Sequence, residues 1–116
     1  MKLKVEVRTD EGFALIRCTG QLIFGEESDV LCGSLEKAFS RFRKCVLNLG
    51  GVEQIDAGGL GILAGWCRNA QALNSQLLLA NVPAEIAEML RLTRLSDVLE
   101  MHESEEAAIH ACCQAA

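Results

Sequence analysis

Residues 45–63 read Cys45-Val-Leu-Asn-Leu-Gly-Gly-Val-Glu-Gln-Ile-Asp-Ala-Gly-Gly-Leu-Gly-Ile-Leu63. The apolar run that opens this stretch is typical of a central strand buried on both faces, and it ends at a glycine pair. An extended loop then leads to Asp56, and an apolar pattern with helical spacing starts at Leu60. Asp56 can cap this helix, and the glycines permit a tight turn before it. The stretch therefore predicts a strand, a loop and a helix start.

The segments on either side indicate an α/β fold. Apolar and charged residues alternate over residues 3–8, which predicts a half-buried strand, and residues 13–19 follow as its hairpin partner across a turn at 9–12. Beyond this hairpin, strands and helices alternate, so right-handed crossovers and a mostly parallel sheet are expected. We predict a single α/β domain over residues 1–116, with a mixed sheet of about five strands and about four helices. Further strands are expected over 45–49, 77–80 and 98–101, and helices over 29–43, 58–74, from 81 onward and over 104–113, with Ser28 or Asp29 capping the first helix and Ser104 the last.

The composition argues against several classes of protein. The net charge is −5, whereas nucleic-acid binding needs a basic surface. The chain lacks a signal-peptide pattern and any apolar run near the ~20 residues of a membrane helix, so we expect a cytoplasmic protein without membrane insertion. The six cysteines include no CxxC pair and are expected to be reduced. His110, Cys112 and Cys113 lack the usual ligand spacing, so neither a metal nor another cofactor is expected.

Catalysis is not expected from this sequence. His102 and His110 have no serine or cysteine nucleophile at a suitable spacing. The glycines at 58–61 lack the lysine of a phosphate-binding loop, and no GxGxxG motif is present. We therefore predict that the chain is not an enzyme.

The helix over residues 58–74 carries the most distinctive candidate surface. At 100° per residue, Gly61, Gly65, Arg68 and Ala72 share one side, while Leu60, Leu63, Cys67 and Ala70 form an inner stripe. Three of the four outer residues are small, which lets another chain approach closely. Two alternatives stay open: this side packs inside its own domain, or the bare N–H groups at the helix start hold a nucleotide phosphate or another anion. Trp66 is either a core residue or an interface anchor.

Four segments, taken in order, resemble the STAS domain, the fold of bacterial anti-sigma factor antagonists. Residues 56–61, Asp-Ala-Gly-Gly-Leu-Gly, resemble the family's Asp-Ser-Ser-Gly-Leu-Gly signature at a helix start. Residues 20–26 resemble its strand-end loop, residues 92–99 its late Leu-Thr-x-Leu turn, and residues 103–108 the start of its final helix. The resemblance covers nearly the whole chain and implies a STAS-like mixed sheet.

The resemblance implies a regulatory module that sequesters an anti-sigma factor of the serine kinase type, or a related signalling protein. In phosphorylated members, the serine or threonine directly before the glycine of the signature accepts phosphate. Here that position is Gly58 and the neighbouring one is Ala57, and neither has a hydroxyl. We therefore expect no phosphorylation switch at this loop. The alternative is a scaffold or a nucleotide- or anion-binding STAS subunit of a signalling or transport complex, and a homodimer is left open. The predicted partner-binding residues are Ile23, Phe24, Asp56, Ala57, Gly58, Gly59, Leu60, Gly61, Gly65 and Arg68.

Overall fold

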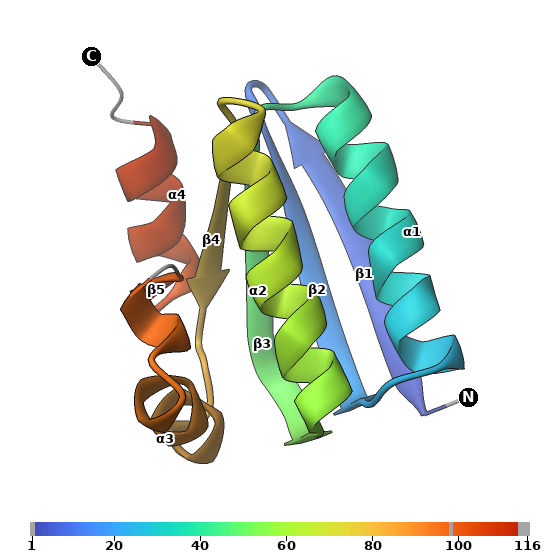
Figure 1. Ribbon diagram of the computed structural model, residues 1–116. Coiled ribbons are helices and arrows are strands. Elements are labelled where there is room, and N and C mark those ends of the chain that lie inside the picture. Colours follow the sequence, from blue (N-terminus) through green and yellow to red (C-terminus); the bar gives the residue numbers. More distant parts are fainter. Residues whose placement is uncertain (1, 98, 114–116) are drawn as a thin grey trace.

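The computed structural model describes residues 2–97 and 99–113, which form five strands, four α-helices and one 3₁₀ turn (Figure 1). Their order along the chain is the predicted one, apart from the 3₁₀ turn, which was not expected. The elements are β1 (Leu3–Asp10), β2 (Phe13–Leu22), α1 (Glu26–Arg41), β3 (Lys44–Ile55), α2 (Ala57–Ala72), β4 (Gln76–Ala80), α3 (Ala84–Leu92), η1 (Leu95–Asp97), β5 (Glu100–His102) and α4 (Glu105–Cys113).

The strands form one mixed sheet in the order β1-β2-β3-β4-β5. β1 and β2 are antiparallel and are joined by a tight turn in which Gly12 has a positive φ of 89°. Glycine adopts this φ without a steric penalty, which suits the turn. The three remaining strand pairs are all parallel. This arrangement confirms the predicted mixed, mostly parallel sheet.

Helices cover both faces of the sheet (Figure 1). Residues of α1, α2 and α3 pack on one face, against strand residues such as Ile16 and Leu47. α4 packs on the opposite face, against Leu15 and Val46. Successive strand residues point to opposite faces, so neighbours in sequence contribute to different layers of the core.

Two strands, β2 and β3, are longer than predicted because each supplies a hydrogen-bonding partner for the extra length of the other. A loop was expected after Leu49, but β3 continues through the glycine pair to Ile55. β2 also extends, to Leu22, and supplies the parallel partner for this second half of β3. β5 starts at Glu100, and Val98 of the predicted strand lies outside the described residues.

The start of α1 also differs from the prediction. The helix begins at Glu26, and its N-cap is Gly25 rather than Ser28 or Asp29. Gly25 has a φ of 124°, which turns the chain into the helix. The Ser28 hydroxyl accepts a hydrogen bond from the Gly25 N–H at 2.9 Å and so closes the first turn from inside the helix.

Two other sequence predictions about the helices are confirmed. The Ser104 hydroxyl accepts a hydrogen bond from the Ala107 N–H at 3.0 Å, so it caps α4 as expected. The inner stripe of α2 is buried, and it consists of Leu60, Leu63, Cys67 and Ala70.

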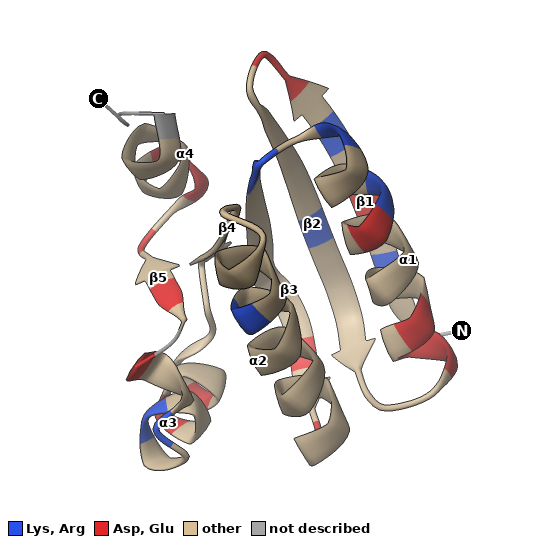
Figure 2. Cartoon of the chain, turned by 45° about the horizontal axis from the view of Figure 1, so that its top comes forward, with Lys and Arg blue, Asp and Glu red and all other residues tan. Residues whose placement is uncertain are grey.

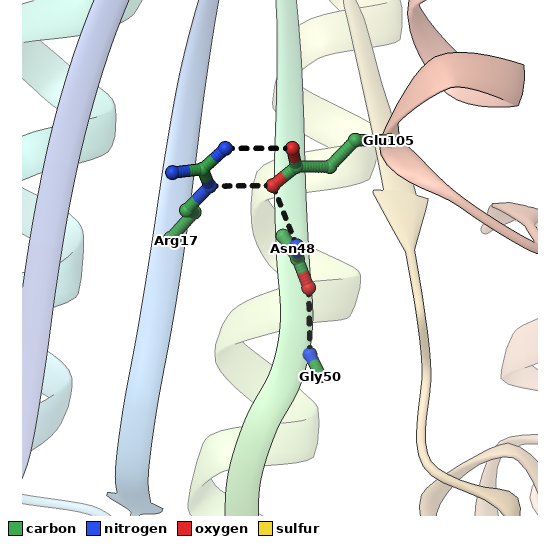
Figure 3. Close-up of polar contacts among 4 residues, drawn as sticks. All are labelled: Arg17, Asn48, Gly50 and Glu105. Atoms are coloured by element: carbon green, nitrogen blue, oxygen red, sulfur yellow. Dashed lines mark hydrogen bonds and ion pairs between the residues drawn. The ribbon is translucent and has the colours of Figure 1, made fainter.

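An ion pair attaches the start of α4 to the centre of the sheet (Figure 3). Arg17 of β2 donates two hydrogen bonds to the Glu105 carboxylate, Nε to Oε2 at 2.7 Å and Nη2 to Oε1 at 2.9 Å. Asn48 of β3 donates a third through Nδ2, at 2.6 Å. The hydrogen bonds from Arg17 lower the pKa of Glu105 from 4.5 to about 2, despite the opposing effect of desolvation. The carboxylate therefore stays charged at neutral pH and fixes α4 on this face.

Glu105→Gln is expected to lower the free energy of unfolding by about 1–2 kcal/mol near neutral pH, because it removes the charge from these hydrogen bonds. The folded-state pKa of Glu105 lies below its ordinary value, so its stabilisation is full above pH 4.5 and is lost as the pH falls toward 2. Urea unfolding should show that the difference in free energy of unfolding between wild type and variant becomes smaller as the pH falls through this range. Glu106→Gln, at an exposed neighbouring position, is the matched control. A difference that stays constant down to pH 2 would contradict this account.

Candidate functional site

Asp56 joins the start of α2 to the end of β2. It is the N-cap of α2, and its Oδ1 accepts a hydrogen bond from the Gly59 N–H at 2.8 Å. The same carboxylate accepts from the Phe24 N–H, at 3.2 Å to Oδ1 and 3.1 Å to Oδ2. The Asp56 N–H in turn donates to the Leu22 carbonyl at 3.4 Å. One side chain thus holds the loop after β2 against the helix start.

This capping role weighs against an anion site at the same place. The N–H groups of Gly59 and Phe24 lower the pKa of Asp56, so its carboxylate is ionised at neutral pH. It already occupies the positive end of the helix dipole and one of the bare N–H donors there. A bound phosphate or sulfate would have to approach this negative charge, which disfavours nucleotide or anion binding at the start of α2.

Phe24 lies against Gly58, the residue that the sequence led us to expect at a phosphoacceptor position. Its side chain is 74% exposed, although it is a large apolar group. A Cβ atom added at Gly58 would lie 2.5 Å from the Phe24 Cβ and 3.0 Å from its Cγ. Such distances are too short for any side chain at position 58 unless the loop moves. The observed position of the Phe24 side chain therefore requires a glycine at position 58.

The outer side of α2 is exposed along its length. Gly61, Gly65, Arg68 and Ala72 are all exposed, so no element among the described residues covers this surface. A Cβ added at Gly61 or at Gly65 would meet nothing within 4 Å. Arg68 is the one charged residue of this helix (Figure 2). We define the α2 surface by its exposed members: Phe24, Asp56, Ala57, Gly61, Gly65 and Arg68.

The remaining predicted site residues lie at or below this surface. Gly59 and Leu60 are buried, and Ile23 and Gly58 are half-buried. A Cβ at Gly59 would lie 2.4 Å from the Leu22 carbonyl oxygen, so a glycine is needed where α2 meets β2. These four residues support the α2 surface from beneath.

Trp66 lies between α1 and α2 and is half-buried. Its ring stacks on Phe39, with centroids 5.9 Å apart and planes inclined by 12°, and its Nε1–H donates to Cys32 Sγ at 3.3 Å. Trp66 therefore packs against the core of its own domain, which was one of the two roles that the sequence left open.

The cysteines and histidines form no evident site in the part of the chain that the structure describes. No group of three or more His, Cys, Asp or Glu residues there is placed to hold a metal ion. Cys112 is buried whereas His110 is exposed, so the two do not face a common site. Burial raises the pKa of Cys18, Cys45 and Cys67 to about 12, which makes these thiols poor nucleophiles.

Within the residues that the structure describes, no helix is both long enough and apolar enough to span a bilayer.

Comparison with known proteins identifies the family. A model of the STAS domain matches residues 4–108. The chain belongs to the STAS domain family. Residues 56–61, which resemble the STAS signature, lie within the matched range and include the Asp56 cap and the start of α2.

Solved structures share the fold of this STAS domain. An anti-sigma factor antagonist from Mycobacterium paratuberculosis has a TM-score of 0.82 and 16% identity, and the match covers 97% of this chain and 95% of that one. Phosphorylated SpoIIAA, a Bacillus cell fate determinant, has a TM-score of 0.72 and 16% identity, over 93% and 99% of the two chains. A sulfate transporter family protein from Wolinella succinogenes has a TM-score of 0.78 and 20% identity, over 91% and 88%. At such identities the likeness shows the fold alone.

Two contacts in the structure were not evident from the sequence. One is the contact of Phe24 with Gly58, although both were predicted site residues. The other is the cluster of Arg17, Asn48 and Glu105 on the α4 face of the sheet. The one signal was polar residues within otherwise apolar strands, and nothing local indicated that they meet.

Proposed function

We propose that this STAS domain is a protein-binding regulatory module, not an enzyme, that captures an anti-sigma factor in the cytoplasm and so releases a sigma factor. The main support for this proposal is the α2 surface, where the exposed side chain of Phe24 lies beside a row of small exposed residues. Aromatic residues are enriched among the residues that dominate binding energy, and small residues let a second backbone approach closely. The whole chain, residues 1–116, acts as one domain in this proposal.

The mechanism is competition for a shared partner. An anti-sigma factor held on the α2 surface is unavailable to its sigma factor, so transcription depends on the relative affinities and amounts of the two competitors. A differential affinity of about 3 kcal/mol changes occupancy by roughly 100-fold. A partner of the serine kinase type fits the family's usual arrangement.

Phosphorylation at the signature loop does not control this competition in our proposal. Residues 56–61 contain no serine or threonine, and Phe24 fills the space beside Gly58. In a switched relative, a phosphate adds close to two negative charges at the interface and opposes binding. Without an acceptor, the amount of the protein sets how much anti-sigma factor is captured.

Affinity capture from a lysate of the organism of origin tests the function. Recovery of an anti-sigma factor kinase that stays bound when ATP is added would support a non-switchable antagonist. Recovery of transporter or sensor subunits without such a kinase would overturn this function. Neither outcome bears on the fold, which is shown independently.

A second experiment tests the missing switch directly. The wild-type chain, incubated with the captured kinase and ATP, should take up no phosphate in residues 56–61. Gly58→Ser/Phe24→Gly supplies a hydroxyl and removes the Cβ that would obstruct it, so we expect phosphorylation at position 58 and release of the partner. Intact-mass spectrometry and a binding assay report both events. Phe24→Gly alone, which removes the same aromatic side chain but supplies no hydroxyl, is the control: it should take up no phosphate at position 58, and its affinity for the partner is the reference against which release is measured. The proposal would be contradicted if the wild-type chain were phosphorylated outside residues 56–61 and then released its partner.

The second candidate is a STAS subunit of a signalling or transport complex. It is favoured by the likeness in fold to the sulfate transporter family protein. The same α2 surface would then dock on a membrane-associated partner. Capture of transporter subunits in the experiment above would select this candidate.

A further inference from the structure

The open edge of β1 has unused hydrogen-bonding groups. Among residues 2–97 and 99–113, β1 is at one end of the sheet and pairs only with β2. The Lys2 carbonyl accepts from the Gln21 N–H at 2.8 Å, which shows that even-numbered residues direct their backbone groups toward β2. Backbone groups alternate along an antiparallel strand, so those of Val5, Val7 and Thr9 point to the open edge. Such an edge is a template for another strand.

The side chains of β1 suit a second copy of the same strand. Consider two β1 strands paired antiparallel, with Val7 opposite Val7. The register then sets Glu6 opposite Arg8 and Lys4 opposite Asp10 of the partner subunit. All four charged residues lie on the sheet face that carries α4, and each meets the opposite sign. Opposite charges directly across two strands are stabilising, and like charges are destabilising.

Val7 is the centre of this pattern and is 48% exposed, although valine is apolar. It lies with Thr9 beside a shallow groove under α1, and Lys37 and Arg41 rim that groove. Pairing with its own copy would cover both valines. The basic rim alone would favour an acidic peptide, but such a peptide would also meet Glu6 and Asp10 on the other face. The alternating signs along β1 favour a second copy instead.

We propose that two copies of the chain associate through antiparallel pairing of β1 with β1 about a two-fold axis at Val7. The contact joins two five-stranded sheets into one continuous sheet and is isologous. α2 packs against β3 and β4, away from this edge. The dimer therefore goes beyond the proposed function and can hold or fail separately from partner binding.

Variants in which all charged residues of β1 have the same sign test the proposed register between the two β1 strands. Lys4→Glu/Arg8→Glu makes the outer residues of β1 wholly acidic, and Glu6→Lys/Asp10→Lys makes them wholly basic. Each variant alone should dimerise about tenfold or more weakly than wild type, because all four cross-strand pairs become repulsive. An equimolar mixture should recover a dimer of wild-type strength, since every acidic residue then faces a basic one. Sedimentation velocity across a concentration series measures all three, and circular dichroism checks that each variant is folded.

Val7→Pro gives an independent test that leaves the charges unchanged. Proline lacks an N–H and is tolerated on edge strands where that group faces solvent, so pairing with β2 should survive while the dimer is lost. Three results would overturn the proposal. One is a wild-type monomer at every concentration up to about 1 mM. Another is a dimer unaffected by Val7→Pro. The third is a monomer that binds an extended acidic peptide along β1.

Discussion

Gly65→Arg is expected to weaken capture of the anti-sigma factor by about 100-fold or more while the domain stays folded. Gly65 lies at the middle of the α2 surface, and a Cβ there meets nothing within 4 Å. The long arginine side chain therefore projects into the space that the partner would occupy. It adds no contact within the domain, so the loss should appear in affinity alone.

The stability of the Gly65→Arg variant shows whether weaker capture reflects a lost binding surface or an unfolded domain. Replacing a helical glycine by arginine improves helix propensity by up to about 1 kcal/mol, so unfolding should occur at the same or a higher urea concentration. Gly33→Arg in α1 is the matched control, because a Cβ at Gly33 also meets nothing within 4 Å but lies outside the α2 surface. Titration calorimetry with the captured partner measures the affinities. Equal affinities for wild type and Gly65→Arg would place the binding site elsewhere.

Gly59→Ala is expected to lower the free energy of unfolding by about 2–3 kcal/mol, since it inserts a methyl group into a filled site. The new Cβ would lie 2.4 Å from the Leu22 carbonyl oxygen and 2.9 Å from Ile55 Cγ1. Neither atom is the free end of a long side chain, so backbone must move. The Leu22 carbonyl also accepts from the Asp56 N–H, and its displacement would disturb the helix cap.

Gly61→Ala provides the control for this prediction, because it makes the same chemical change two residues along the same helix. Its Cβ meets nothing within 4 Å, and alanine is the better helix former, so a gain of up to about 1 kcal/mol is expected. Urea unfolding of both variants gives the comparison. Equal stabilities would show that α2 and β2 are not in close contact at Gly59.

Local periodicity made most of the fold predictable. The alternation in residues 3–8 and the helical spacing of Leu60, Leu63 and Cys67 are consequences of backbone geometry, which every segment carries in its own sequence. They were enough for the order of elements, the mixed sheet and the buried stripe of α2. The side of α2 that bears Gly61 and Gly65 was likewise assigned from spacing, and the structure leaves it exposed.

The candidate site was predictable in composition but not in arrangement. The lack of a hydroxyl at Gly58 is visible in the sequence, and so is the capping role of Asp56. The contact of Phe24 with Gly58 is not visible, because it depends on how the loop after β2 meets the start of α2. Whether the outer side of α2 was covered by its own domain could also not be decided from spacing.

By itself, the sequence determined the kinds of element, their order and the absence of a phosphate acceptor at the signature loop. The tertiary structure alone decided that β3 continues to Ile55, that Arg17 meets Glu105 and that Phe24 lies on Gly58. The physical reason is the range of the interactions. Strand and helix periodicities arise from neighbours along the chain, whereas these contacts join residues that only the packing of separate elements brings together.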